Sequence, residues 1–123
     1  MTRFLLATDS VHTTAAACDY LQGRLAGDDE VVVVSVTGPE TGRDAADAAN
    51  VARVRLTDAD VVIDSRDGEP GPTILSAADD HGADEIVVGT AGGEPGSERR
   101  VGSTVEHVVA NADVPAVVVP SQV

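Results

Sequence analysis

Short runs of apolar, mostly β-branched residues recur along the chain and are separated by longer segments of mixed polarity. Such runs are typical of strands that are buried on both faces of a parallel sheet. The predicted strands are 3–8 (RFLLAT), 31–36 (VVVVSV), 61–63 (VVI), 86–88 (IVV) and 116–119 (AVVV).

The segments between these runs carry apolar residues at helical spacing. The first stripe consists of Val11, Ala15, Cys18, Leu21 and Leu25. Asp9 or Ser10 can cap this helix, and Gly27 is predicted to end it. A thinner stripe of alanines predicts a second helix over residues 40–56.

A third helix is predicted to hold Pro72 in its first turn and to end at His81–Gly82, and Ser103 can cap a fourth. Strands and helices therefore alternate, with connections long enough for right-handed crossovers between parallel strands. We predict one α/β domain over residues 1–123, a Rossmann-like open sheet of five parallel strands with helices on both faces.

The composition adds an extreme charge balance: 21 acidic residues stand against 8 basic ones, and lysine is absent. A domain with a net charge of −13 repels the phosphates of nucleic acids and of anionic membranes, so neither is predicted as a partner. Acid excess, missing lysine and small apolar residues resemble the proteins of extreme halophiles, as in haloarchaea. The alternative is an ordinary acidic cytosolic protein.

The residues that several classes of binding or catalytic site require are missing from the sequence. Without lysine there is neither a Walker A phosphate loop nor Schiff-base chemistry. The turn after the first strand, ATDSVH, lacks the glycines of a dinucleotide fingerprint. The three histidines show no ligand spacing, and the serines lack a nucleophile elbow, so no metal site and no catalytic centre are predicted.

Targeting signals are likewise not recognisable. The N-terminal residues MTRFLLATDS do not have the pattern of a signal peptide, and no apolar run approaches the ~20 residues of a membrane span. The single cysteine, Cys18, lies on an apolar stripe and is predicted to be a core residue. We expect a cytoplasmic protein.

The most specific signal lies between residues 86 and 105. Gly89 and Gly92 are followed after nine residues by Gly102-Ser103, which gives the spacing G-x2-G-x9-G-[ST]. Backbone N–H groups of such a loop, together with a helix N-terminus, favour an anion such as phosphate. A switch in strand order beside the first strand would bring Asp9, Val36 and Gly89 together.

With this spacing the chain resembles the universal stress protein family, in its ATP-binding branch, over essentially its whole length. The resemblance also rests on ATDS at the end of the first strand, on Gly68-Glu69-Pro70, on ADEIVVGT and on VPAVVVP. It implies the strand order 3-2-1-4-5 and a stress-response protein that binds ATP, with or without Mg²⁺, and at most hydrolyses it slowly. It also implies a homodimer formed by the strand Ala116–Val119, for which Val117 and Val119 are suited.

The resemblance further implies a set of site residues. Ala7, Thr8 and Asp9 would contact adenine and ribose, Val36 would flank the adenine, and Val88, Gly89 and Thr90 would border the adenosine. Gly92, Gly102 and Ser103 would hold the phosphates, with Thr104 close by.

Parts of the loop depart from the family pattern and leave alternatives open. Glu94 and Glu98 oppose a triphosphate, whereas Arg99 and Arg100 could compensate. One alternative is an interaction module of the same fold that binds no nucleotide. Another is a nucleotide-dependent transferase of the wider adenine-nucleotide α-hydrolase-like group, although ATDSVHTT lacks the early phosphate loop of such enzymes.

Overall fold

The chain is described by a computed structural model, which covers residues 2–8, 11–25, 28–37, 50–51, 54–56, 60–89 and 103–119. Its strands are β1 (Arg3–Thr8), β2 (Glu30–Thr37), β3 (Asp60–Asp67), β4 (Glu85–Gly89) and β5 (Ala116–Val119). Its helices are α1 (Val11–Gln22), α3 (Pro70–His81) and α4 (Ser103–Asn111).

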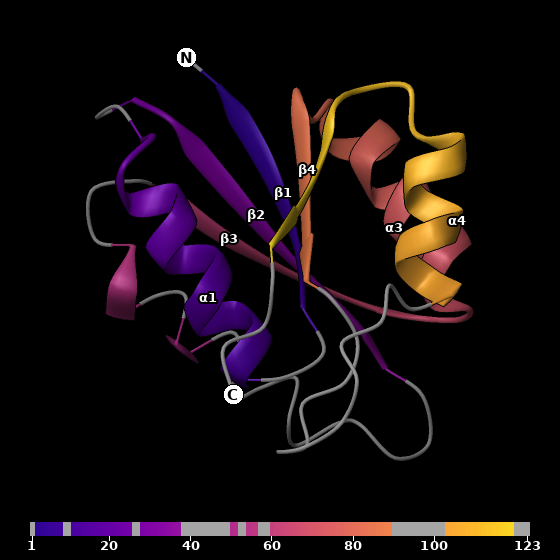
Figure 1. Cartoon of the computed structure of the whole chain (residues 1–123), viewed down its shortest axis with the longest axis horizontal. Coiled ribbons are helices and arrows are strands. Elements are labelled where there is room, and N and C mark those ends of the chain that lie inside the picture. The colour runs from indigo at the N-terminus through magenta and orange to yellow at the C-terminus, as the bar shows by residue number, and fades with distance from the viewer. Residues whose placement is uncertain are drawn as a thin grey trace.

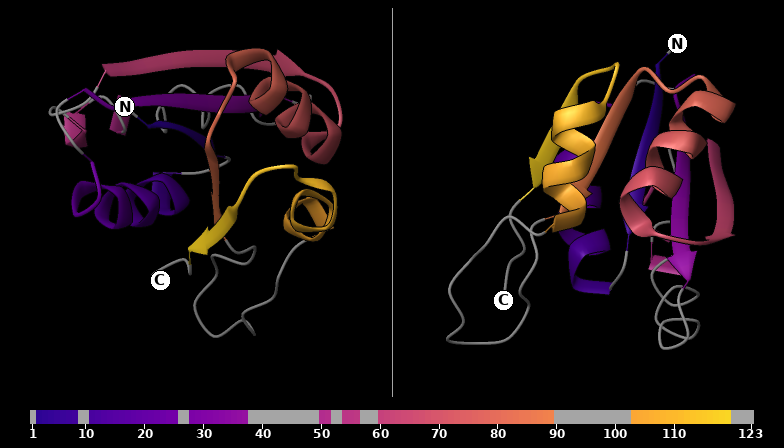
Figure 2. Two further views of the ribbon diagram at one scale, coloured as in Figure 1. Left: turned by 90° about the horizontal axis from the view of Figure 1, so that it is seen from above. Right: turned by 90° about the vertical axis from the view of Figure 1, so that its right-hand side faces the viewer.

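All five strands form one parallel sheet in the order β3-β2-β1-β4-β5. Helix α1 covers one face of this sheet, and α3 and α4 cover the other (Figures 1 and 2). The predicted fold class and strand order are therefore confirmed.

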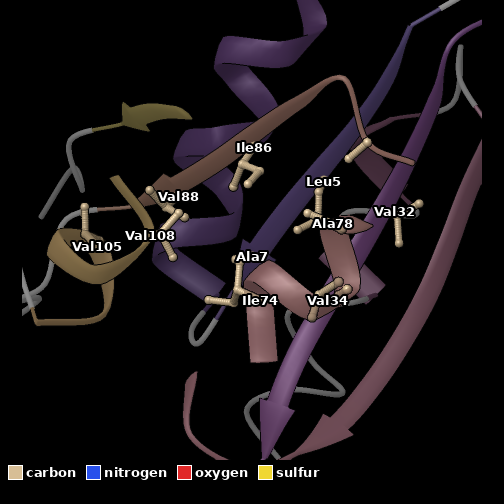
Figure 3. Close-up of a cluster of buried hydrophobic side chains, with 12 residues drawn as sticks. Leu5, Ala7, Val32, Val34, Ile74, Ala78, Ile86, Val88, Val105 and Val108 are labelled. Carbon is tan, nitrogen blue, oxygen red and sulfur yellow. The ribbon is translucent and has the colours of Figure 1, made fainter. Parts of the chain in front are cut away.

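Alternation along the strands divides the core into two apolar clusters, one on each face of the sheet. Phe4, Leu6, Val31 and Val33 pack with α1 side chains such as Leu21. The intervening strand residues pack under α3 and α4, and Figure 3 shows this second cluster; its members include Leu5, Val32, Val34, Ile74, Ile86, Val88, Val105 and Val108. Small branched side chains suffice because the helices lie directly on the sheet.

Cys18 lies in the first of these clusters and is fully buried. Burial raises the pKa of its thiol to about 11. The thiol is therefore protonated near neutral pH and unreactive, since the thiolate is the nucleophilic form. Cys18 is a core residue, as the sequence pattern predicts.

Several elements differ in length from their predictions, most of all α1 and β3. Helix α1 ends at Gln22 because the N–H groups of Arg24 and Leu25 both donate to the carbonyl oxygen of Leu21, at 2.8 and 3.0 Å, in a tight turn. Leu25 continues the apolar stripe because this turn packs it against the core. Gly27, the predicted end, lies outside the described residues.

Strand β3 is longer than the predicted 61–63 and stays in register with β2 from Asp60 to Asp67. Its charged half is stable as a strand because Arg66 Nε donates to Asp64 Oδ2 at 3.0 Å and Arg66 Nη1 donates to Asp80 Oδ2 at 2.9 Å. Of the predicted helix 40–56, residues 50–51 and 54–55 are helical, and the other positions up to 55 lie outside the described residues.

Helix α3 begins at Pro70, so Pro72 lies in its first turn as predicted; prolines are well suited to the first positions of a helix. It ends as predicted at Gly82, whose φ of 63° is a left-handed conformation that glycine adopts readily.

The amino end of the sheet is fastened by Arg3. Its Nε donates to Glu30 Oε1 at 2.9 Å, its Nη1 donates to the His81 carbonyl oxygen at 2.7 Å, and its backbone N–H donates to Asp84 Oδ2 at 2.9 Å. One residue thereby joins β1 to β2, to the end of α3 and to the start of β4. A cation at the carboxyl end of α3 also complements the helix dipole.

Helices α3 and α4 approach closely at Gly71, and this contact gives a stability prediction. A Cβ at Gly71 would lie 2.8 Å from His107 Cδ2 and 3.0 Å from His107 Cβ. We expect Gly71→Ala to lower the free energy of unfolding by about 1–2 kcal/mol, since overpacking costs about 1–3 kcal/mol. Urea denaturation measures the change.

The matched control is Gly23→Ala, because nothing lies within 4 Å of the Cβ position there. That variant should be as stable as the wild type or slightly more stable. Adding His107→Ala to Gly71→Ala should recover part of the loss, because alanine removes the imidazole ring and keeps only the Cβ. Equal stability of Gly71→Ala and wild type, or no recovery in the double variant, would contradict the proposed clash.

Candidate functional site

The carboxyl ends of the strands share one edge of the sheet because all strands are parallel. β1 ends there at Thr8, β2 at Thr37 and β4 at Gly89. Helix α4 runs antiparallel to the strands, so its N-terminal end lies towards the same edge (Figure 1). The helix begins at Ser103. A ligand at this edge can therefore meet strand ends and a helix N-terminus together.

The order of the strands reverses between β1 and β4, since the chain continues from β1 towards β2 and β3 and from β4 towards β5. The pairing of β1 with β2 extends to Thr8–Ser35, whereas the described pairs between β1 and β4 end at Leu6–Val87. Ala7 and Val88 lie beyond that last pair. Open α/β sheets bind their ligands at such a switch point.

The structure brings three predicted apolar site residues to one face of this edge. Ala7 and Val88 are 7% and 2% exposed, and both belong to the cluster under α3 and α4 (Figure 3). Val36, on β2, is partly buried and packs against the same cluster. Val105 of α4 joins them, so the start of α4 is held against the ends of β1 and β4 by apolar contacts.

The remaining predicted residues are placed only in part. Thr8 and Gly89 are the last residues of β1 and β4, while Ser103 and the half-buried Thr104 open α4. The other four, Asp9, Thr90, Gly92 and Gly102, lie outside the described residues. The first turn of α4 favours a negative charge by about 0.3–1 kcal/mol.

One polar residue at this edge was not singled out by the sequence. Ser35 interrupts the valine run of β2 and is 1% exposed. Its Oγ has no hydrogen-bond partner among the described residues. The sequence feature that could have pointed to Ser35 is that it is the only hydroxyl-bearing residue in the run VVVVSV.

A cluster of charged side chains lies elsewhere, between β3 and the end of α3. His81 Nε2 lies 2.7 Å from Asp64 Oδ2, which also accepts from Arg66. Burial alone would raise the pKa of Asp64, but the hydrogen bonds from His81 and Arg66 outweigh it and hold that pKa below its usual value. The cluster thus joins β3 to α3 and has a structural role.

The described part of the chain has neither a metal-binding cluster nor a membrane-spanning helix. No group of three or more His, Cys, Asp or Glu side chains there is arranged to hold a metal ion. Among the helices described, none is long and apolar enough to cross a membrane.

Comparison with known families decides the classification. The profile of the universal stress protein family matches residues 1–120. The chain belongs to this family. A search of curated protein sequences found no match.

Solved structures share the fold of this universal stress protein. The hypothetical protein MJ0577 is 21% identical with a TM-score of 0.83, over 99% of this chain and 97% of that chain. A universal stress protein in complex with cAMP is 20% identical with a TM-score of 0.72, over 98% of both chains. The universal stress protein from Archaeoglobus fulgidus in complex with dAMP is 21% identical with a TM-score of 0.68, over 97% of this chain and 98% of that chain.

Proposed function

We propose that this universal stress protein binds an adenine nucleotide at the carboxyl edge of its sheet and serves in a stress response. The observation that carries the proposal is the switch point between β1 and β4, with the N-terminus of α4 at the same edge. Two proteins of the same fold were crystallised with cAMP and dAMP, which supports an adenine nucleotide as the ligand class.

Within this proposal, ATP is the ligand, with or without Mg²⁺, and the loop G-x2-G-x9-G-S holds its phosphates. Gly92, Gly102 and Ser103 contribute backbone N–H groups, because glycine allows the closest approach of backbone to phosphate. Asp9 contacts the ribose and Val36 flanks the adenine. Binding, with hydrolysis slow at most, is the proposed activity.

We further propose a homodimer that acts in the cytoplasm at high salt. β5 is an edge strand, paired on one side with β4. On its α1 face, Val119 belongs to the apolar cluster and the partly buried Val117 packs against it. An open, valine-rich edge of this kind is protected from aggregation when a second copy covers it.

Isothermal titration calorimetry at 2 M KCl with AMP, ATP and ATP–Mg²⁺ tests the nucleotide proposal. We expect saturable binding by the wild type and at least tenfold weaker binding by Gly102→Val, because the branched side chain keeps phosphate away from the backbone. Gly23→Ala should bind like the wild type, because Gly23 directly follows α1 and nothing lies within 4 Å of its Cβ position.

The acidic loop residues Glu94 and Glu98 favour a second candidate, an interaction module that binds no nucleotide. Absence of heat with all three ligands, together with absence of nucleotide in the purified protein, would support that candidate and refute the first. Turnover of a nucleotide with transfer of its AMP group would instead indicate the transferase.

A further inference from the structure

A small cavity of about 60 Å³ lies between the C-terminal halves of α3 and α4, near the amino edge of the sheet. The two helices run side by side on one face of the sheet (Figure 1). The cavity walls come from α3, from the turn that leads into β4, from Ile86 of β4 and from the end of α4 with the segment that follows it. The nucleotide proposed above lies at the carboxyl edge, so it does not account for this cavity.

The floor of the cavity is buried and apolar. Ala78 of α3, Ala83 of the following turn and Ile86 of β4 are 7%, 7% and 1% exposed, and all three belong to the core cluster under α3 and α4. The partly buried Leu75 and Val114 also line it. A cavity of this volume holds about four water-sized groups, but an apolar floor offers water few hydrogen-bond partners. A short hydrocarbon chain suits this floor better than water does.

The mouth of the cavity is polar and acidic. Its exposed lining residues are Asp79, Asn111 and Asp113. Within the described part of the chain, neither carboxylate has an ion-pair partner. Asn111 Nδ2 donates to the carbonyl oxygen of His107 at 2.8 Å, so the amide can offer its own oxygen to a ligand. The mouth therefore presents two negative charges and an amide oxygen to whatever binds there.

Two helix ends add to the negative potential at this place. α3 ends at His81 and α4 at Asn111, and the C-terminus of a helix favours a cation. The cationic groups at the end of α3 are engaged towards β2 and β3, where Arg3 bonds to Glu30 and His81 to Asp64. Among the described residues, no Arg or His side chain lines the cavity. A cation from outside the chain would meet a complementary charge there.

The order of polar mouth and apolar floor favours a free amine over a lysine side chain of a partner protein. A free alkylammonium ion can insert its tail next to Ala83 and Ile86 and leave its charge at the mouth. A lysine side chain enters with its ammonium group first. It would bring the charge to the apolar floor, where removal from water is costly, and leave its carbon chain beside the carboxylates.

We propose that this cavity binds a primary alkylammonium ion with a tail of about four carbons, a length that matches the cavity volume. The ammonium group lies between Asp79 and Asp113, and its three N–H donors match the two carboxylates and the amide oxygen of Asn111. The inference does not depend on nucleotide binding, because the two sites lie at opposite edges of the sheet.

The test is a titration of the nitrogen-labelled full chain with n-butylammonium chloride, followed by proton–nitrogen correlation NMR at constant ionic strength. We expect saturable shifts of the backbone amides of Ala83, Ile86 and Val114, with a Kd of about 1–10 mM for so small a ligand. Methylammonium lacks the tail and butanol lacks the charge, so each should bind at least about fivefold more weakly. Nα-acetyl-lysine methylamide, which imitates a lysine of a partner protein, should also bind at least about fivefold more weakly.

Charge-removing variants test the position of the ammonium group. Asp79→Asn and Asp113→Asn keep the shape of the side chain, and each should weaken the binding of butylammonium by about two- to fivefold. Asp60→Asn is the matched control, because it changes the net charge equally and Asp60 is exposed outside the cavity. It should bind butylammonium like the wild type.

Each contrary result overturns the inference at a different step. Shifts that do not saturate, or that follow acidic residues over the whole surface, would show only the general attraction of cations to an acidic protein. Equal binding by Asp79→Asn, Asp113→Asn and the wild type would refute the assigned position of the charge. If the lysine analogue binds as tightly as butylammonium, the tail-first orientation is wrong, and with it the free amine as occupant.

Discussion

Replacing Leu6 with alanine is expected to lower the free energy of unfolding by about 2–5 kcal/mol, the usual cost of such a cavity. Leu6 is fully buried on the middle strand β1, in register with Val33 on one side and Val87 on the other. With few large side chains in the core, its neighbours have little freedom to fill the space. Urea denaturation at fixed KCl gives the value.

Val109→Ala is the matched control, since Val109 is 53% exposed on α4. Its effect should stay within about 0.5 kcal/mol of zero. A loss below 1 kcal/mol for Leu6→Ala, with an unchanged dependence on urea, would mean that β1 is not the central packed strand.

Thermal stability is expected to rise steeply with salt. A net charge of −13 repels itself over the whole domain in dilute buffer, where the screening length is about 30 Å at 0.01 M, but only over about 3 Å at 1 M. Acidic residues begin three of the strands, at Glu30, Asp60 and Glu85, and Glu30 and Asp60 are register partners on neighbouring strands. We expect the midpoint of unfolding to rise by roughly 10 °C from 0.01 to 1 M KCl, which corresponds to about 2–3 kcal/mol.

Asp60→Asn with Asp79→Asn removes two exposed charges and should reduce this salt response. Differential scanning calorimetry across the KCl series measures both proteins. A midpoint that does not move with KCl would contradict the role of charge repulsion, and with it the halophilic character proposed for the chain.

The sheet could be predicted from local pattern alone because its central strands are continuous apolar runs. Val31 to Val34 are all fully buried, alternately in the two core clusters, which is the environment such a run requires. Gly82 marked the end of α3 because its left-handed conformation is a local requirement of the chain. Features that depend on neighbouring residues are the ones that sequence reasoning finds.

Features that depend on distant partners could not be predicted. Asp64 and Arg66 belong in a strand because His81 and Asp80, from the end of α3, complete their hydrogen bonds. The burial of Ser35 and its register with the neighbouring strands likewise could not be predicted from the sequence. The apolar part of the candidate site followed from the resemblance, and the roles of its loop residues remain predictions.

The contacts of Arg3 have an evolutionary consequence. They fasten strands and a helix at the amino end of the sheet, at the opposite edge from Thr8, Gly89 and Ser103. Loops at the carboxyl edge can therefore be exchanged or lengthened while the anchoring interactions stay intact. Such a separation lets descendants of one scaffold acquire new ligands by small mutational steps, without first having to regain a stable fold.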